Sequence, residues 1–154
     1  VEDAYKMLLT ESCPSWLYQV KAGATTLWER WDALKPDGES NTGADDGTKG
    51  MVSFNHYANG AVGNFFYKRI AGIEPIKGGY AEFRIKPVLG GGLTFASASF
   101  ESPYGMIKSS WRIEDDRFNI DVEIPVGTKC HLSMPNGEEK LLHSGEFSFE
   151  QKIK

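Results

Sequence analysis

The sequence has few cysteines and histidines, no excess of basic charge and no long apolar run. Two cysteines, Cys13 and Cys130, occur among 154 residues without a C-x-x-C spacing, so we expect two buried thiols and neither a metal nor another cofactor. The formal net charge is −4 and no basic block occurs, which argues against a nucleic-acid partner. No apolar run approaches the roughly 18 residues of a membrane span, so we expect no membrane partner.

Glycine and aromatic residues are plentiful. The chain has 17 glycines and 12% aromatic residues, while its 40% apolar and 25% charged residues are ordinary for a folded protein. This mixture is typical of all-β domains and of carbohydrate sites. The first residues are acidic where a signal peptide needs basic ones, so this segment predicts no particular cellular compartment.

The periodicity of the sequence changes near Gly72–Gly79. Before this break, apolar residues recur at helical spacing over residues 3–10 and again over residues 53–71, which predicts two helices, the second capped by Ser53 and stopped by Gly72. The stretch between them, residues 12–52, predicts a long loop that is functional or disordered.

After the break, apolar and polar residues alternate as in half-buried strands. Turn signals separate these runs, and Pro135-Asn136-Gly137 is a strong hairpin signal. Six or seven antiparallel strands, each hiding one face, predict a β-sandwich. The expected strands cover residues 81–86, 93–100, 107–113, 118–124 and 130–134, with one or two more within residues 141–149.

The first 72 residues complete no architecture of their own. Their two helices carry apolar faces without an obvious partner, and each large side chain left unburied forgoes about 1.5–3 kcal/mol. Two explanations remain open from the residues alone. Either partner helices lie elsewhere, or the second helix packs across the sandwich as one α+β domain.

The segment Gly23–Asp32 places a carboxylate, Glu29, between Trp28 and Trp31. Sugars stack their C–H faces on indole rings, and a carboxylate beside them accepts a proton from water or bonds to hydroxyl groups. This pattern indicates a sugar site. The alternative is that both tryptophans are core anchors and that Glu29 is a surface residue in a salt bridge.

A second candidate site is Ser53–His56, at the start of the predicted second helix. Unpaired N–H groups at such a helix end, together with Asn55 and His56, suit a polar site. A neutral histidine both donates and accepts hydrogen bonds, which matches vicinal hydroxyl groups. The alternative for His56 is a single capping contact.

Four segments in this order, GATTLWERWD, SFNHYANGAV, AGIEPIKGGYAEFRIKP and LTFASASFESPYGMIKSSW, carry a family resemblance. Together they resemble the C-terminal part of bacterial α-L-rhamnosidases of glycoside hydrolase family 78, over about residues 4–137. The resemblance implies a mixed fold, in which a C-terminal antiparallel β-sandwich follows the last helices of an (α/α)6 barrel. Residues 1–72 would be the incomplete barrel end and residues 73–154 the sandwich domain.

The resemblance also implies an activity, the hydrolysis of terminal α-L-rhamnosyl groups with inversion of configuration. Glu29 matches the general base and His56 a histidine that contacts the bound sugar, while Trp28, Trp31 and Asn55 would line the pocket. The partners would be a rhamnose-containing oligosaccharide or glycoside and the remainder of the catalytic domain. The family's general acid lies in an upstream motif that this sequence lacks, so we expect the chain alone to be inactive. The alternative function is a non-catalytic carbohydrate-binding or structural β-sandwich module.

Overall fold

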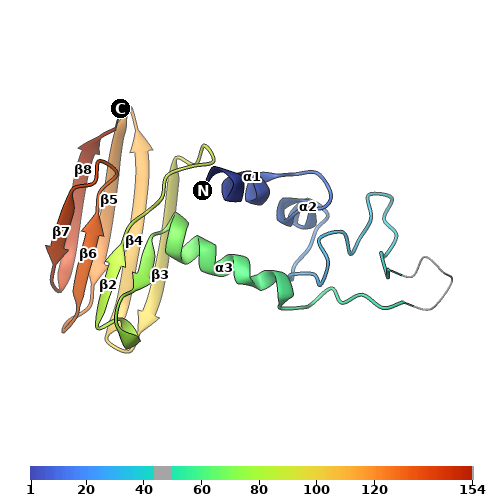
Figure 1. Ribbon diagram of the computed structural model, residues 1–154, viewed down its shortest axis with the longest axis horizontal. Helices are drawn as coiled ribbons and strands as arrows, with labels where there is room; N and C mark the ends of the chain where they lie inside the picture. Colours follow the sequence, from blue (N-terminus) through green and yellow to red (C-terminus); the bar gives the residue numbers. More distant parts are fainter. Residues whose placement is uncertain (44–49, 154) are drawn as a thin grey trace. The chain divides into compact units, whose positions relative to one another are not determined.

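The computed structural model describes residues 1–43 and 50–153 and divides the chain into two compact units. The first unit is Val1–Val62 and the second is Gly63–Lys154. The first is mainly helical and irregular, whereas the second contains the strands (Figure 1). No helix in the described residues is long and apolar enough to cross a membrane.

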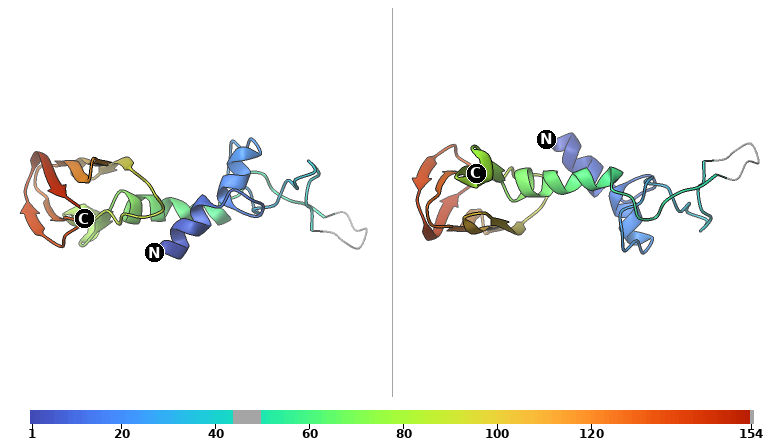
Figure 2. Two further views of the ribbon diagram at one scale, coloured as in Figure 1. Left: turned by 90° about the horizontal axis from the view of Figure 1, so that it is seen from above. Right: turned by 90° about the horizontal axis from the view of Figure 1, so that it is seen from below.

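The second unit is a β-sandwich, as the alternation predicts, with its strands in two layers when viewed from above (Figure 2). Each layer is a four-stranded sheet in the described residues. One sheet has the order β1-β2-β6-β7, formed by β1 (Ile73–Pro75), β2 (Glu82–Ile85), β6 (Lys129–Ser133) and β7 (Glu139–Leu142). The other has the order β3-β4-β5-β8, formed by β3 (Phe95–Ser102), β4 (Gly105–Glu114), β5 (Arg117–Ile124) and β8 (Gly145–Lys152).

The sheets differ from the expectation in two details. Strand β1 has only three residues and shows no alternation long enough to detect, and the sequence analysis missed it. Strands β2 and β6 pair in parallel, whereas the other neighbours pair antiparallel. Alternation reveals which face of a strand is buried and not the direction of its neighbour, so the parallel pair was invisible in the sequence.

The sandwich core is continuous and apolar. Its members come from the inward positions of both sheets, and burying each large side chain stabilises the fold by about 1.5–3 kcal/mol. The core contains Ile73, Phe83, Ile85, Ile107, Trp111, Phe118, Ile120, Val122, Ile124, Cys130, Leu132, Met134 and Leu142. Burial raises the pKa of Cys130 to about 12. The expectation of two buried thiols holds for Cys130, but Cys13 is partly exposed.

The helix predicted over residues 53–71 begins later than expected. It consists of a 3₁₀ turn, η1 (Ala58–Ala61), then α3 (Val62–Phe65) and the π-helical η2 (Phe66–Ile70). Ser53 does not cap it, because the Ser53 hydroxyl accepts from the Asn55 N–H at 3.2 Å and donates to the Asn55 carbonyl at 3.0 Å. Such local side-chain turns compete with helix.

The end of this helix is bonded to the sandwich within the second unit. Gly72 stops it as predicted, with φ of 83°, and a Cβ there would collide with the backbone of Lys86 and Pro87. The Ser109 hydroxyl and the Trp111 indole N–H, both on β4, donate to the carbonyls of Ala71 and Ile70, each at 2.7 Å. These bonds satisfy carbonyl groups that a helix end leaves unpaired.

Among its described residues, the first unit contains two short helices before the turn η1. Helix α1 (Glu2–Leu9) lies where the periodicity predicts it and buries Tyr5 and Leu8. Helix α2 (Trp16–Lys21) lies inside the stretch predicted as loop, so that part of the prediction was wrong. Its start is marked by Ser15, whose hydroxyl accepts the Tyr18 N–H at 3.0 Å, an N-cap that the sequence analysis overlooked.

Candidate functional site

Both candidate segments lie side by side in the first unit. The Glu29 N–H donates to the Ser53 carbonyl at 2.9 Å, and the His56 N–H donates to the Leu27 carbonyl at 2.8 Å. The Thr26 hydroxyl adds a bond to the Phe54 carbonyl. These backbone bonds bring together the two segments that the sequence singled out separately, and no pattern in the sequence indicated that they pair.

Glu29 is exposed and held at one carboxylate oxygen. Its Oε2 accepts the Ser53 N–H at 2.8 Å. No cation lies within ion-pair distance of Glu29 among the described residues, and the neighbouring Arg30 instead bonds to Asp32, with 3.2 Å between Nε and Oδ1. Ser53 thus fixes one end of the carboxylate, while Oε1 accepts no hydrogen bond from the residues that the structure describes and can accept one from a water molecule or a hydroxyl group.

His56 is half-buried and oriented by its own neighbours. Its Nδ1 accepts the Ala58 N–H at 3.0 Å, which is the capping contact of the alternative interpretation. The ring stacks on Tyr57, with centroids 5.1 Å apart and planes 10° apart. Because Nδ1 is an acceptor, neutral His56 carries its proton on Nε2 and presents a donor there. Asn55, next to it, is exposed.

The tryptophans differ in their exposure. Trp28 is only 4% exposed and packs edge-to-face on Phe54, with centroids 5.3 Å apart. Trp31 is partly exposed and packs on Trp16 at 4.8 Å. The ring of Trp28 therefore acts as a core anchor in this unit, with little surface left for a ligand, while Trp31 keeps some.

Two amide side chains at the site were missed by the sequence analysis. Gln19, on α2, accepts the Trp28 N–H on its Oε1 at 3.2 Å. Asn59, in η1, donates from Nδ2 to the Trp28 carbonyl at 3.1 Å and to the Glu29 carbonyl at 3.5 Å. Amides that bond to distant backbone leave no spacing signal in a sequence. The available indication was that Asn59 lies within SFNHYANGAV, one of the four segments that carry the family resemblance.

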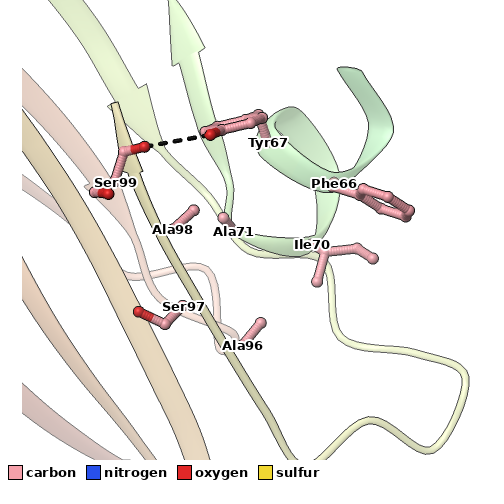
Figure 3. A pocket seen from close by; sticks show the side chains of 8 residues that line it. All are labelled: Phe66, Tyr67, Ile70, Ala71, Ala96, Ser97, Ala98 and Ser99. Carbon is pink, nitrogen blue, oxygen red and sulfur yellow. Dashed lines mark hydrogen bonds between the residues drawn. The ribbon is translucent and has the colours of Figure 1, made fainter. Parts of the chain in front are cut away.

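Three hollows of the second unit are lined by none of the candidate residues. One of about 480 Å³ lies between the helix and strand β3, where the Tyr67 hydroxyl donates to the Ser99 carbonyl at 3.3 Å (Figure 3). Its walls are mostly apolar and hold no acid for catalysis. They comprise Phe66, Tyr67, Ile70, Ala71, Ala96, Ser97, Ala98 and Ser99. The described residues also contain no group of three or more His, Cys, Asp or Glu side chains placed to hold a metal.

Comparison with known proteins matches both units to one family. Residues 1–70 match the bacterial α-L-rhamnosidase six-hairpin glycosidase domain, and residues 72–147 match the bacterial α-L-rhamnosidase C-terminal domain. An α-L-rhamnosidase of Formosa agariphila is 37% identical over 152 residues, which are 97% of this chain and 16% of that protein. One of Streptomyces avermitilis is 39% identical over 132 residues, or 86% of this chain and 12% of that protein.

Solved structures agree with these matches. The crystal structure of α-L-rhamnosidase from Aspergillus terreus superposes with a TM-score of 0.90 at 38% identity, covering 97% of this chain and 17% of that one. The Streptomyces avermitilis α-L-rhamnosidase in complex with L-rhamnose gives 0.88 at 34% identity, covering 98% and 16%. The chain thus spans about a sixth of these relatives. It belongs to the bacterial α-L-rhamnosidase family and corresponds to the C-terminal part of the larger proteins of that family.

Proposed function

We propose that this chain supplies the general base of an inverting α-L-rhamnosidase, and that the base is Glu29. The observation that carries the proposal is the state of the Glu29 carboxylate, which is exposed, unpaired with any described cation and oriented by the Ser53 N–H at 2.8 Å. A carboxylate in this state accepts a proton from a water molecule as that water attacks the sugar. A carboxylate held in a salt bridge is a weaker base.

His56 is proposed to bind the sugar. Its Nε2–H is a donor next to the segment that carries Glu29, and its Nδ1 is already used by Ala58. Trp31 and the exposed Asn55 are proposed to complete this wall of the pocket. Trp28 belongs to the wall through its backbone and supports it from within, because its ring is buried against Phe54.

Inversion needs a second carboxyl group, roughly 6.5–9.5 Å from the first, that protonates the leaving oxygen. We place this general acid in the remainder of the catalytic domain, which is then an obligatory partner of the chain. The substrate class is a terminal α-L-rhamnoside. The domain boundary is proposed near residue 72, with the barrel end before it and the sandwich after it.

Glu29→Gln in the complete enzyme tests the assignment. Loss of a positioned general base lowers kcat by about 100-fold or more, measured with an aryl α-L-rhamnoside, while Glu39→Gln, an exposed glutamate of the same unit, leaves kcat unchanged. Inversion is checked by NMR, which should detect the β-anomer of rhamnose first. Near-normal kcat in Glu29→Gln removes the residue from this role, and an α-anomer formed first removes inversion.

The chain alone is expected to be inactive, since the proposed general acid lies in the remainder of the catalytic domain. The purified 154-residue chain should release no phenol from an aryl α-L-rhamnoside above the uncatalysed rate. Adding the separately produced remainder of the enzyme tests whether the two pieces restore activity. Turnover by the chain alone would contradict the division of the carboxyl pair.

A further inference from the structure

The backbone around Glu29 is held by side-chain amides. Neither Trp28 nor Glu29 belongs to a helix or a strand, and Glu29 has one backbone bond to the neighbouring segment, from its N–H to the Ser53 carbonyl at 2.9 Å. Side-chain amides add to this bond: Gln19 Oε1 accepts the Trp28 N–H at 3.2 Å, and Asn59 Nδ2 donates to the carbonyls of Trp28 and Glu29 at 3.1 and 3.5 Å. One amide thus bonds to an N–H group of this dipeptide and the other amide to its two carbonyl groups.

The two amides are themselves anchored by folded elements. Gln19 is 2% exposed and sits on α2, and Asn59 sits in η1. Trp16, three residues before Gln19 on the same helix, donates its indole N–H to the Asn59 carbonyl at 3.3 Å. Helix α2 therefore contacts the Trp28–Glu29 dipeptide directly through Gln19. It also contacts the dipeptide indirectly, because Trp16 of the same helix bonds to Asn59.

We propose that Asn59, supported by Gln19, is a positioning residue for Glu29. The inference rests on the proposed function, since it gives Asn59 a role only if Glu29 is the base. The side chain of Glu29 is tied at Oε2 to Ser53 and its backbone N–H to the Ser53 carbonyl. Asn59 fixes the opposite side of the same residue, so its loss lets the carboxylate drift away from the attacking water. Misplacement of a reacting group by about 1 Å can cost about 100-fold in rate.

Asn59→Asp in the complete enzyme is the sharpest test, because aspartate has the same shape but cannot donate to the two carbonyls. We expect kcat to fall by at least about 10-fold, with KM changed by less than about threefold, since the bond that is lost serves the reacting group. Asn64→Asp is the matched control, the same change at an exposed asparagine of α3, and it should leave both constants unchanged.

A double-mutant cycle separates positioning from a structural role. In the Glu29→Gln background there is no base left to position, so Asn59→Asp should lower kcat by less than about twofold further. A structural residue would lower kcat equally in both backgrounds, and that result would overturn the proposal. Asn59→Ala, which removes the donor without adding a charge, and Gln19→Met give the same readout if Asn59→Asp does not fold.

The cycle also distinguishes this inference from the proposed function. If Glu29→Gln lowers kcat and Asn59→Asp and Asn59→Ala do not, Glu29 is the base and Asn59 does not position it. If Glu29→Gln leaves kcat unchanged, the proposed function fails first. A loss of kcat in the Asn59 variants that is independent of Glu29 then assigns them a structural role.

Discussion

The two units of the chain place their apolar side chains differently. Of the buried apolar residues described, four lie in the first unit and fourteen in the second. In the first unit, several large apolar side chains face outward, with Met51 90% and Tyr57 88% exposed. The sandwich can therefore be stabilised by its own core. The first unit carries the candidate site on a frame with little core, and its exposed apolar surface fits the proposed contact with the remainder of the catalytic domain.

The two units also differ in how their backbone is held. Ladder bonds run through the sandwich sheets, whereas the segment around Glu29 relies on single bonds from Ser53, Asn59 and Gln19. A ladder tolerates the loss of one side chain. The segment around Glu29 instead has a few separate backbone and side-chain bonds, and its geometry changes when one of the side-chain bonds is removed. Function in the first unit should therefore respond to substitutions that leave stability almost unchanged.

The largest expected effect on stability is in the sandwich core. Phe118 on β5 is fully buried against Trp111, with ring centroids 6.0 Å apart. Phe118→Ala should lower the free energy of unfolding by about 3–5 kcal/mol, because it leaves a cavity in a packed core. The comparison is Phe54→Ala, at a side chain 37% exposed in the first unit, with an expected loss below about 2 kcal/mol. Urea unfolding followed by circular dichroism measures both, and equal losses would contradict the contrast between the units.

A smaller effect is expected where the helix joins the sandwich. Ser109 is fully buried and donates to the Ala71 carbonyl at 2.7 Å. Ser109→Ala leaves that carbonyl buried without its donor, which should cost about 1–3 kcal/mol in the free energy of unfolding. Ser97→Ala, at an exposed serine of β3, is the control and should cost less than about 0.5 kcal/mol. A Ser109→Ala loss as small as that of the control would mean that the helix end is not held by this bond.

The sandwich was largely predictable from the sequence because alternation is a local signal. The buried positions of β5, from Phe118 to Ile124, follow the predicted pattern residue by residue. The parallel pairing of β2 with β6 was not predictable, since it depends on which sheet a strand joins after a crossover. The bond from Ser109 to Ala71 likewise joins residues 38 positions apart, and no local pattern encodes it.

The candidate site was predictable only in part. Glu29 and His56 stood out by their residue types and by the family resemblance, and their catalytic and binding roles remain proposals. The pairing of their segments and the amide bonds from Gln19 and Asn59 arise from tertiary structure. The late start of the helix, at Ala58, was missed because the Ser53 hydroxyl bonds to Asn55 in a local turn, and a serine before apolar residues is equally typical of a cap and of such a turn.

The smallest expected effect is a pH dependence at the parallel pair of the sandwich. Glu82 on β2 bonds to Lys77 and, at 2.9 Å, to His131 on β6. The hydrogen bonds from Lys77 and His131 hold the pKa of the Glu82 carboxyl below its ordinary value of 4.5. The pKa of Glu82 is lower in the folded state than in the unfolded state. The interactions of ionised Glu82 with Lys77 and His131 therefore stabilise the fold above about pH 4.5, and this stability is lost as the pH falls through the folded-state pKa.

Glu82→Gln tests this sign. The variant should unfold at a lower temperature than the wild type at neutral pH, and the difference should shrink as the pH falls, since protonation removes the same charge from the wild type. Glu101→Gln, at an exposed glutamate of β3 that forms no ion pair with a described residue, should show no such convergence. Thermal unfolding across a pH series measures both. If the difference in unfolding temperature stays constant down to acidic pH, Glu82 acts through packing. The contact between β2 and β6 would then not depend on the charge of Glu82.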